Sequence, residues 1–181
     1  MRRIFSLQVN MLMLPALLAV TTIVIAQLPL RLWLPALLLS WTLLALAVVD
    51  YRLFLLPDML TLPLLWLGLL ASTIGLLPGL TPEQAVYGAA AGYSTLWLLS
   101  RGYWLLRKKE GLGLGDAKLL AALGAWTGLE RLPWIVLLAT LITSAALFAA
   151  WLMFRHPLNA PFPFGPALAF AGWTIFLWLY G

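Results

Sequence analysis

The sequence predicts an all-α fold, a polytopic membrane helix bundle of about six to seven transmembrane helices. Two observations lead to this prediction. Hydrophobic residues make up 64% of the 181 residues and charged residues only 9%, whereas about 25% of an ordinary soluble domain is charged. The apolar residues also form continuous runs, which indicate membrane helices because an open sheet cannot span lipid. This composition excludes a soluble globule and a disordered chain, and we treat residues 1–181 as one integral-membrane domain.

Seven apolar segments are candidate spans, since each approaches the roughly 20 residues that a membrane helix needs. They are about 4–26, 33–49, 59–79, 84–106, 117–130, 132–154 and 166–180. Turn-forming or charged residues separate them at 28–31, 50–52, 78–83, 107–110, 130–131 and 155–157. The first segment has an alternative as a cleaved signal peptide, because Val24-Ile25-Ala26 resembles a cleavage site. Its length and the polar Gln8 and Asn10 favour a retained helix; cleavage would leave six spans.

The distribution of Lys and Arg predicts a cytoplasmic N-terminus, because cytoplasmic loops of membrane proteins are enriched in these residues. In that orientation nine basic residues lie on the cytoplasmic side: Arg2, Arg3, Arg52, Arg101, Arg107, Lys108, Lys109, Lys118 and Arg155. Only Arg31 and Arg131 lie on the other side. The net charge of +5 is therefore attributed to membrane topology, with the lipid bilayer as a partner and no nucleic acid.

The chemically reactive residues are few. There is no Cys, which excludes a disulfide framework and a thiol nucleophile, and the single His156 lacks a nearby Ser or Asp for a triad. We expect no metal and no cofactor. The three Asp residues, Asp50, Asp58 and Asp116, all fall on the predicted cytoplasmic side. Two carboxylates that share a proton can activate water for peptide hydrolysis, so an aspartic dyad is the leading hypothesis.

Each aspartate also has a structural interpretation. Asp50 ends the second segment, where the helix dipole disfavours a carboxylate, although pairing with Arg52 would explain it. Asp58 and Asp116 precede the third and fifth segments and could be ordinary N-caps. If Asp50 and Asp116 form the dyad, the two helix dipoles predict that Asp50 holds the proton and that the pKa of Asp116 is lowered.

Glycines alternate before Asp116, at Gly111, Gly113 and Gly115. Such a loop allows close backbone approach and suits an extended substrate, whereas it lacks the Gly-Lys-Ser/Thr of a phosphate-binding loop. Lys118 could either extend to the lipid headgroups or lower the pKa of Asp116.

Three stretches together resemble the type IV prepilin peptidases. The first is Asp50-x6-Pro57-Asp58 followed by residues 62–69, the second is residues 110–126 with the Gly113-Leu114-Gly115-Asp116 (GxGD) motif, and the third is Pro163-Phe164-Gly165-Pro166. The similarity runs from about residue 43 to residue 173.

The resemblance implies a membrane-embedded aspartic endopeptidase of the bacterial inner membrane. Such enzymes cleave the short basic leader from type IV prepilins and type II secretion pseudopilins at the cytoplasmic face. Carried over by motif, Asp50 and Asp116 are the catalytic pair. The expected supporting residues are Asp58, Gly113, Gly115 and Lys118, and Glu110 is a candidate for binding the basic leader.

The sequence departs from longer members of that family, which carry an N-terminal region with two Cys-x-x-Cys pairs and also methylate the new N-terminus. We therefore expect protease activity without a zinc site and without methyltransferase activity. Two alternatives remain open: a presenilin-like intramembrane protease, and a non-enzymatic transporter or secretion-complex subunit. The sequence leaves the oligomeric state unknown.

Overall fold

A computed structural model of the chain describes residues 2–107, 113–154 and 162–181. These residues form α-helices and two short 3-10 turns, without any strand in the described ranges. The elements are α1 (Arg2–Gln27), η1 (Leu30–Leu32), α2 (Trp33–Leu53), α3 (Asp58–Thr73), α4 (Pro82–Arg107), α5 (Leu114–Thr127), η2 (Leu129–Arg131), α6 (Leu132–Phe154) and α7 (Gly165–Tyr180). The predicted all-α bundle is confirmed, and each predicted span corresponds to one α-helix.

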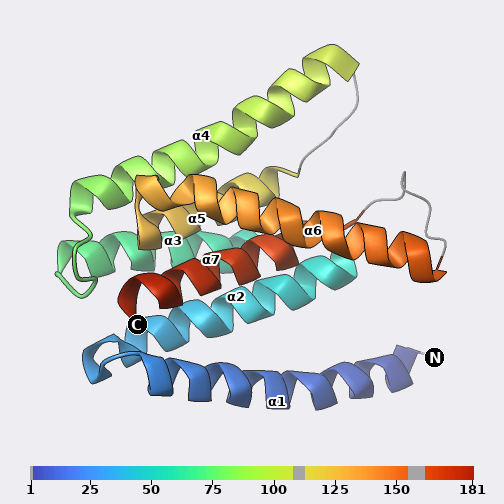
Figure 1. The fold of residues 1–181 in the computed structure, drawn as a ribbon, viewed down its shortest axis with the longest axis horizontal. Helices are drawn as coiled ribbons and strands as arrows, with labels where there is room; N and C mark the ends of the chain where they lie inside the picture. Colours follow the sequence, from blue (N-terminus) through green and yellow to red (C-terminus); the bar gives the residue numbers. More distant parts are fainter. Residues whose placement is uncertain (1, 108–112, 155–161) are drawn as a thin grey trace.

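Successive helices run in alternating directions, so the N-terminus and the C-terminus lie at opposite ends of the bundle (Figure 1). We call one end the aspartate end: α2, α4 and α6 finish there, and α3, α5 and α7 begin there. The N-terminus of α1 lies at the same end. We call the other the opposite end; it holds the connections 28–32, 74–81 and 128–131.

Three helices end three or more residues away from their predicted ends. The second predicted span ran to residue 49, whereas α2 continues to Leu53. The third predicted span ran to residue 79, whereas α3 ends at Thr73. Gly75 (φ 70°) and Gly79 (φ 75°) adopt the left-handed conformation that favours glycine and turn the chain. The fifth predicted span ran to residue 130, but α5 ends at Thr127 because Gly128 (φ 79°) ends it.

Helix α5 forms the centre of the bundle and packs against α3, α4 and α7. Its residues 119–127 are all buried. Glycines of α4 allow the closest approach: a Cβ added to Gly88 would collide with the carbonyl oxygen of Gly124, and one added to Gly92 would lie 2.6 Å from that of Leu120. The small residues 88–92 therefore form a face that allows close helix packing.

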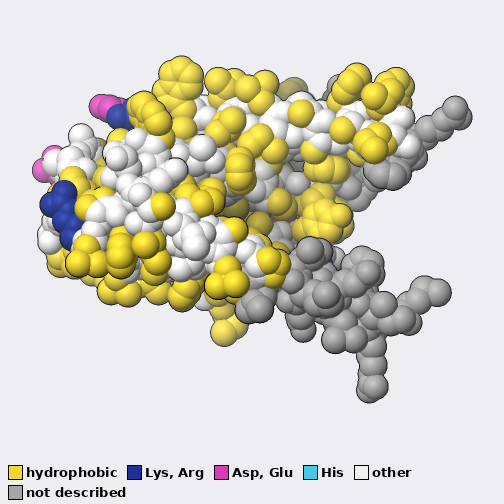
Figure 2. Space-filling model, turned by 60° about the horizontal axis from the view of Figure 1, so that its bottom comes forward, with side chains coloured by type: hydrophobic (Ala, Val, Ile, Leu, Met, Phe, Trp, Pro, Cys, Tyr) yellow, Lys and Arg dark blue, Asp and Glu magenta, His cyan; other side chains and the backbone are white. Residues whose placement is uncertain are grey.

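Within the described residues, two helices are long and apolar enough to cross a membrane, with spans at Leu30–Leu53 and Leu129–Met153. Only 11% of the apolar window of the second span is buried inside the protein, against 39% of that of the first. Large apolar side chains are accordingly exposed, among them Met59 (87%) and Trp178 (70%). Figure 2 shows hydrophobic side chains along the length of one face. In this view the Lys, Arg, Asp and Glu side chains gather at the end of the bundle that is away from the aspartates.

Candidate active site

The side chain of Asp50 lies in the last turn of α2 and is 6% exposed. The helix ends just beyond it, because Phe54 takes a left-handed conformation (φ 53°) and donates its N–H to the Asp50 carbonyl at 2.8 Å. The Asp50 carboxylate accepts a hydrogen bond at Oδ2 from the backbone N–H of Gly165, 3.0 Å away. The carboxylate is therefore held by the backbone of α7, and the alternative of an Asp50–Arg52 pair finds no ion pair in the described residues.

Gly165 is a site residue that the sequence prediction missed. It is the first residue of α7, and a Cβ added to it would lie 2.5 Å from Asp50 Oδ2. The position therefore needs glycine for packing, and the N-terminus of α7 faces the carboxylate with its favourable dipole end. The sequence feature that could have pointed to Gly165 is the Pro163-Phe164-Gly165-Pro166 stretch. This stretch contributed to the family resemblance and was given no role in the site.

Asp116 lies in the first turn of α5, before the apolar residues that begin at Ala117. Burial, together with the nearby Asp50 carboxylate, raises the pKa of Asp116 to about 7. The predicted lowering of this pKa by the helix dipole is wrong, because the cost of burying the charged form exceeds the benefit of the dipole. The two aspartates are thus close enough to interact electrostatically, as a dyad requires.

Asp58 is the first residue of α3 and does not cap it; the N-cap position is Pro57. Its Oδ1 lies 2.6 Å from Nζ of Lys118 on α5. Lys118 was expected either to extend to the lipid headgroups or to lower the pKa of Asp116. Its ammonium group binds Asp58 instead. The ion pair joins the start of α3 to the turn of α5 that follows Asp116.

The glycines before Asp116 have different surroundings. A Cβ added to Gly115 would lie 2.9 Å from Cβ of Leu56, so Gly115 lets the 54–57 connection approach α5. Gly113 is the exposed N-cap residue of α5, and its carbonyl accepts the N–H of Asp116 at 3.2 Å. Gly115 therefore lets the connection that follows the Asp50-bearing helix lie against the segment that bears Asp116.

Several residues that the sequence singled out lie outside the described residues, among them Glu110, the candidate for leader binding, Gly111 and His156. In the described part of the chain, no group of three or more His, Cys, Asp or Glu side chains could hold a metal ion.

The arrangement has the parts that acid-base hydrolysis requires: two neighbouring carboxyl groups, one with a raised pKa and one fixed by a backbone donor. Both lie within the last or first turn of a helix. This position at the end of the bundle suits cleavage near a membrane surface better than a proton relay through the middle of the membrane.

Comparison with known proteins extends this description. The sequence model of the "Type IV leader peptidase family" matches residues 36–150. A "Prepilin leader peptidase/N-methyltransferase" of Aeromonas salmonicida is 49% identical over 104 residues, which is 57% of this chain and 36% of that protein. Proteins of the same name from Neisseria gonorrhoeae and Pseudomonas aeruginosa are 52% and 48% identical over 99 and 97 residues, covering 54% and 53% of this chain and 33% of each relative.

The chain thus spans about a third of the length of the curated relatives that it matches. No solved structure matches it. The family match covers more than half of the chain and includes Asp50, Asp58, Asp116 and Lys118. The chain belongs to the type IV leader peptidase family.

Proposed function

We propose that this protein is an aspartic endopeptidase that removes the short basic leader from type IV prepilins or type II secretion pseudopilins. Asp50 and Asp116 are the catalytic pair in this proposal. One carboxyl group binds the proton that the pair shares, while the other accepts a proton from the attacking water. No cofactor takes part.

The observation that carries the proposal is that Asp50, in the last turn of α2, and Asp116, in the first turn of α5, lie at the same end of the bundle. The segments that bear them are 66 residues apart in sequence (116 − 50). Three contacts support the arrangement: the Gly165 donor on Asp50, the Leu56–Gly115 packing and the Asp58–Lys118 ion pair. The shared name of the relatives supports prepilins as the substrate class.

The proposed location is the bacterial inner membrane, with the N-terminus and the aspartate end on the cytoplasmic side. The bias of Lys and Arg towards this end supports the orientation. Asp58 is already paired with Lys118, and Glu110 stays the proposed acid that binds the basic leader. The absence of methyl transfer stays a prediction, tested by incubating the purified protein with S-adenosylmethionine and a cleaved pilin.

The test is co-expression of the chain with a prepilin that carries a basic leader, followed by electrophoresis of the pilin. The wild-type protein should shorten the pilin, and Asp50→Asn and Asp116→Asn should each leave it at full length. Glu83→Gln is the matched control, because it removes an acid from the opposite end of the bundle. It should cleave normally.

Cleavage by both aspartate variants would overturn the catalytic assignment. If the wild-type protein, once shown to be folded and in the membrane, cleaved no prepilin or pseudopilin, the proposed substrate class would be wrong. An intact pilin together with cleavage inside a membrane span of another substrate would favour the intramembrane protease instead.

A further inference from the structure

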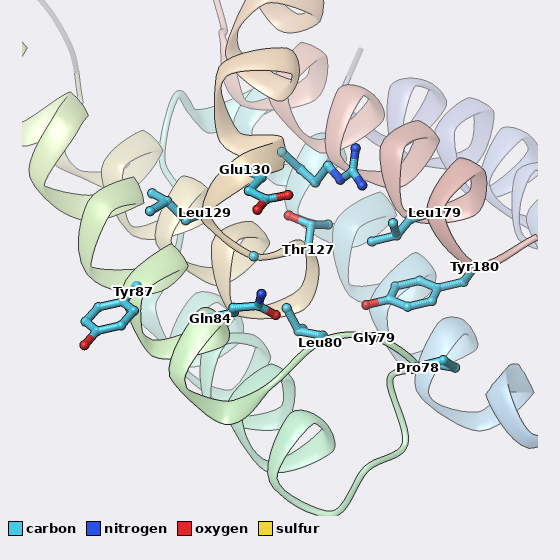
Figure 3. Close-up of a pocket in the computed structure, with 12 residues that line it drawn as sticks. Pro78, Gly79, Leu80, Gln84, Tyr87, Thr127, Leu129, Glu130, Leu179 and Tyr180 are labelled. Atoms are coloured by element: carbon cyan, nitrogen blue, oxygen red, sulfur yellow. The ribbon is translucent and has the colours of Figure 1, made fainter.

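A cavity of about 350 Å³ lies at the opposite end of the bundle, away from the aspartates. Its wall is formed by the 78–80 connection, the first turns of α4, η2 and the end of α7. The volume falls within the range of small-molecule sites in proteins. Figure 3 shows the side chains of Gln84, Thr127 and Tyr180 converging on this space, whereas Tyr87 points away from it.

The polar wall of the cavity is held in place by hydrogen bonds to backbone groups. The hydroxyl of Tyr180 donates to the carbonyl of Trp126 at 3.2 Å, and the hydroxyl of Thr127 donates to that of Leu123 at 2.9 Å. Gln84 and Thr81 cap the start of α4 reciprocally, at 3.1 and 3.2 Å. The cavity is therefore largely formed before any ligand enters.

Glu130 and Arg131 place one negative and one positive group on the rim of this cavity. The guanidinium group of Arg131 lies 5.4 Å from the ring centre of Trp178. Within the described residues, neither side chain forms a hydrogen bond or an ion pair. The rim thus offers an anion site and a cation site side by side.

The membrane-capable span of α6 begins at Leu129, directly at this rim. If α6 crosses the bilayer, Glu130 and Arg131 lie at the level of the lipid headgroups. Large apolar side chains are exposed next to the charges, with Leu129 at 47% and Trp178 at 70%. A molecule that binds here would therefore meet charged groups beside an apolar surface.

We propose that the cavity binds the headgroup of a zwitterionic phospholipid, of the phosphatidylethanolamine type. Arg131 contacts the phosphate, for which a guanidinium group is well suited. Glu130 accepts hydrogen bonds from the lipid ammonium group, and the acyl chains lie along the apolar surface of α6 and α7. The carboxylate of Glu130 disfavours an anionic lipid, which has a phosphate but no ammonium group.

The test measures lipid binding by native mass spectrometry of the purified full chain. Phosphatidylethanolamine and phosphatidylglycerol with identical acyl chains are titrated separately. The wild-type protein should bind phosphatidylethanolamine about two- to fivefold more tightly, the effect of one partly exposed ion pair. Glu130→Gln should remove this preference, and Arg131→Gln should weaken the binding of both lipids.

Two matched controls carry charges at the same end of the bundle but outside the cavity, namely Arg31→Gln and Glu83→Gln. Both should bind lipid as the wild-type protein does. Equal binding of the two lipids by the wild-type protein would overturn the proposal, and so would a preference that survives Glu130→Gln. Loss of binding in the controls to the same extent would also overturn it. This readout is independent of leader cleavage, so it stands or falls separately from the proposed function.

Discussion

The backbone N–H of Gly165 donates a hydrogen bond of 3.0 Å to Oδ2 of Asp50, across 115 residues of sequence. The C-terminal end of α2 and the N-terminal end of α7 therefore meet at one carboxylate. The negative end of the α2 dipole is offset there by the positive end of α7. The orientation of Asp50 consequently depends on how α7 packs in the bundle.

Replacing Gly165 with Ala should reduce leader cleavage by roughly a hundredfold, since an added Cβ would displace the Asp50 carboxylate. Cleavage rates of the purified variant on a prepilin would measure this effect. Gly102→Ala is the matched control, because no atom lies within 4 Å of a Cβ added there. Equal rates for the two variants would show that the Gly165–Asp50 contact is dispensable.

Breaking the Asp58–Lys118 ion pair should slow leader cleavage measurably while changing the free energy of unfolding only slightly. Its side chains are 55% and 31% exposed, so the pair contributes no more than about 0.2–1 kcal/mol to folding. Asp58→Asn and Lys118→Met should each slow cleavage about two- to fivefold by loosening the start of α5. The exchange variant Asp58→Lys/Lys118→Asp should recover part of the rate; no recovery would indicate that the residues act separately.

Leader cleavage should fall as the pH rises above about 7, where Asp116 loses its proton and the pair no longer shares one. The charged Asp50 is one cause of the raised pKa of Asp116, so below that pH Asp116 holds the proton and Asp50 accepts a proton from the attacking water, the reverse of the roles expected from the helix dipoles. Initial rates between pH 5 and 9 would measure the profile. A rate that stays constant or rises across this range would contradict the assignment of Asp116 as the group that holds the shared proton.

The same carboxyl group should make folding stability depend on pH. Its pKa is about 7 in the folded protein and 3.8 in the unfolded reference, so the folded state binds more protons between these values. Stability should therefore fall as the pH rises from about 4 to about 7. Thermal unfolding of wild type and Asp116→Asn isolates this contribution: the variant should lose less stability over that range.

Gly88→Ala should destabilise the bundle by about 1–3 kcal/mol, because the new Cβ would push α4 away from the backbone of Gly124. Gly102→Ala on the same helix should instead stabilise it by about 0.5–1 kcal/mol, through the higher helix propensity of Ala. Thermal unfolding in detergent would compare them. A similar change in both variants would contradict the close α4–α5 packing.

The number and approximate positions of the helices could be predicted, because each apolar run is bounded by charged or turn-forming residues. The end of α3 could not, since Leu76 and Leu77 continue the apolar run although the chain already turns at Gly75. Asp50 and Asp116 could be selected as candidates because so few ionisable residues exist. Their catalytic role stays a prediction.

The contacts that complete the site depend on the fold. Asp58 and Lys118 are 60 residues apart in the sequence. From its neighbours alone, Asp58 was expected as an N-cap and Lys118 as a partner of Asp116 or of the headgroups, and neither role is the contact that the structure shows. The helix dipole at Asp116 could be inferred from sequence, whereas its burial could not, and burial determines its pKa. The cavity beside Glu130 was not predicted either, because its wall comes from four separate segments.

Helix α5 has 14 residues and measures about 21 Å along its axis, shorter than the roughly 30 Å hydrocarbon layer of a bilayer. Its neighbours in the bundle, rather than lipid tails, surround it. We therefore expect that α5 cannot partition stably into the membrane when it first leaves the ribosome. We expect α5 to stay at the translocation machinery until the helices that pack around it have assembled. The segment that bears Asp116 would then join the site late in biogenesis.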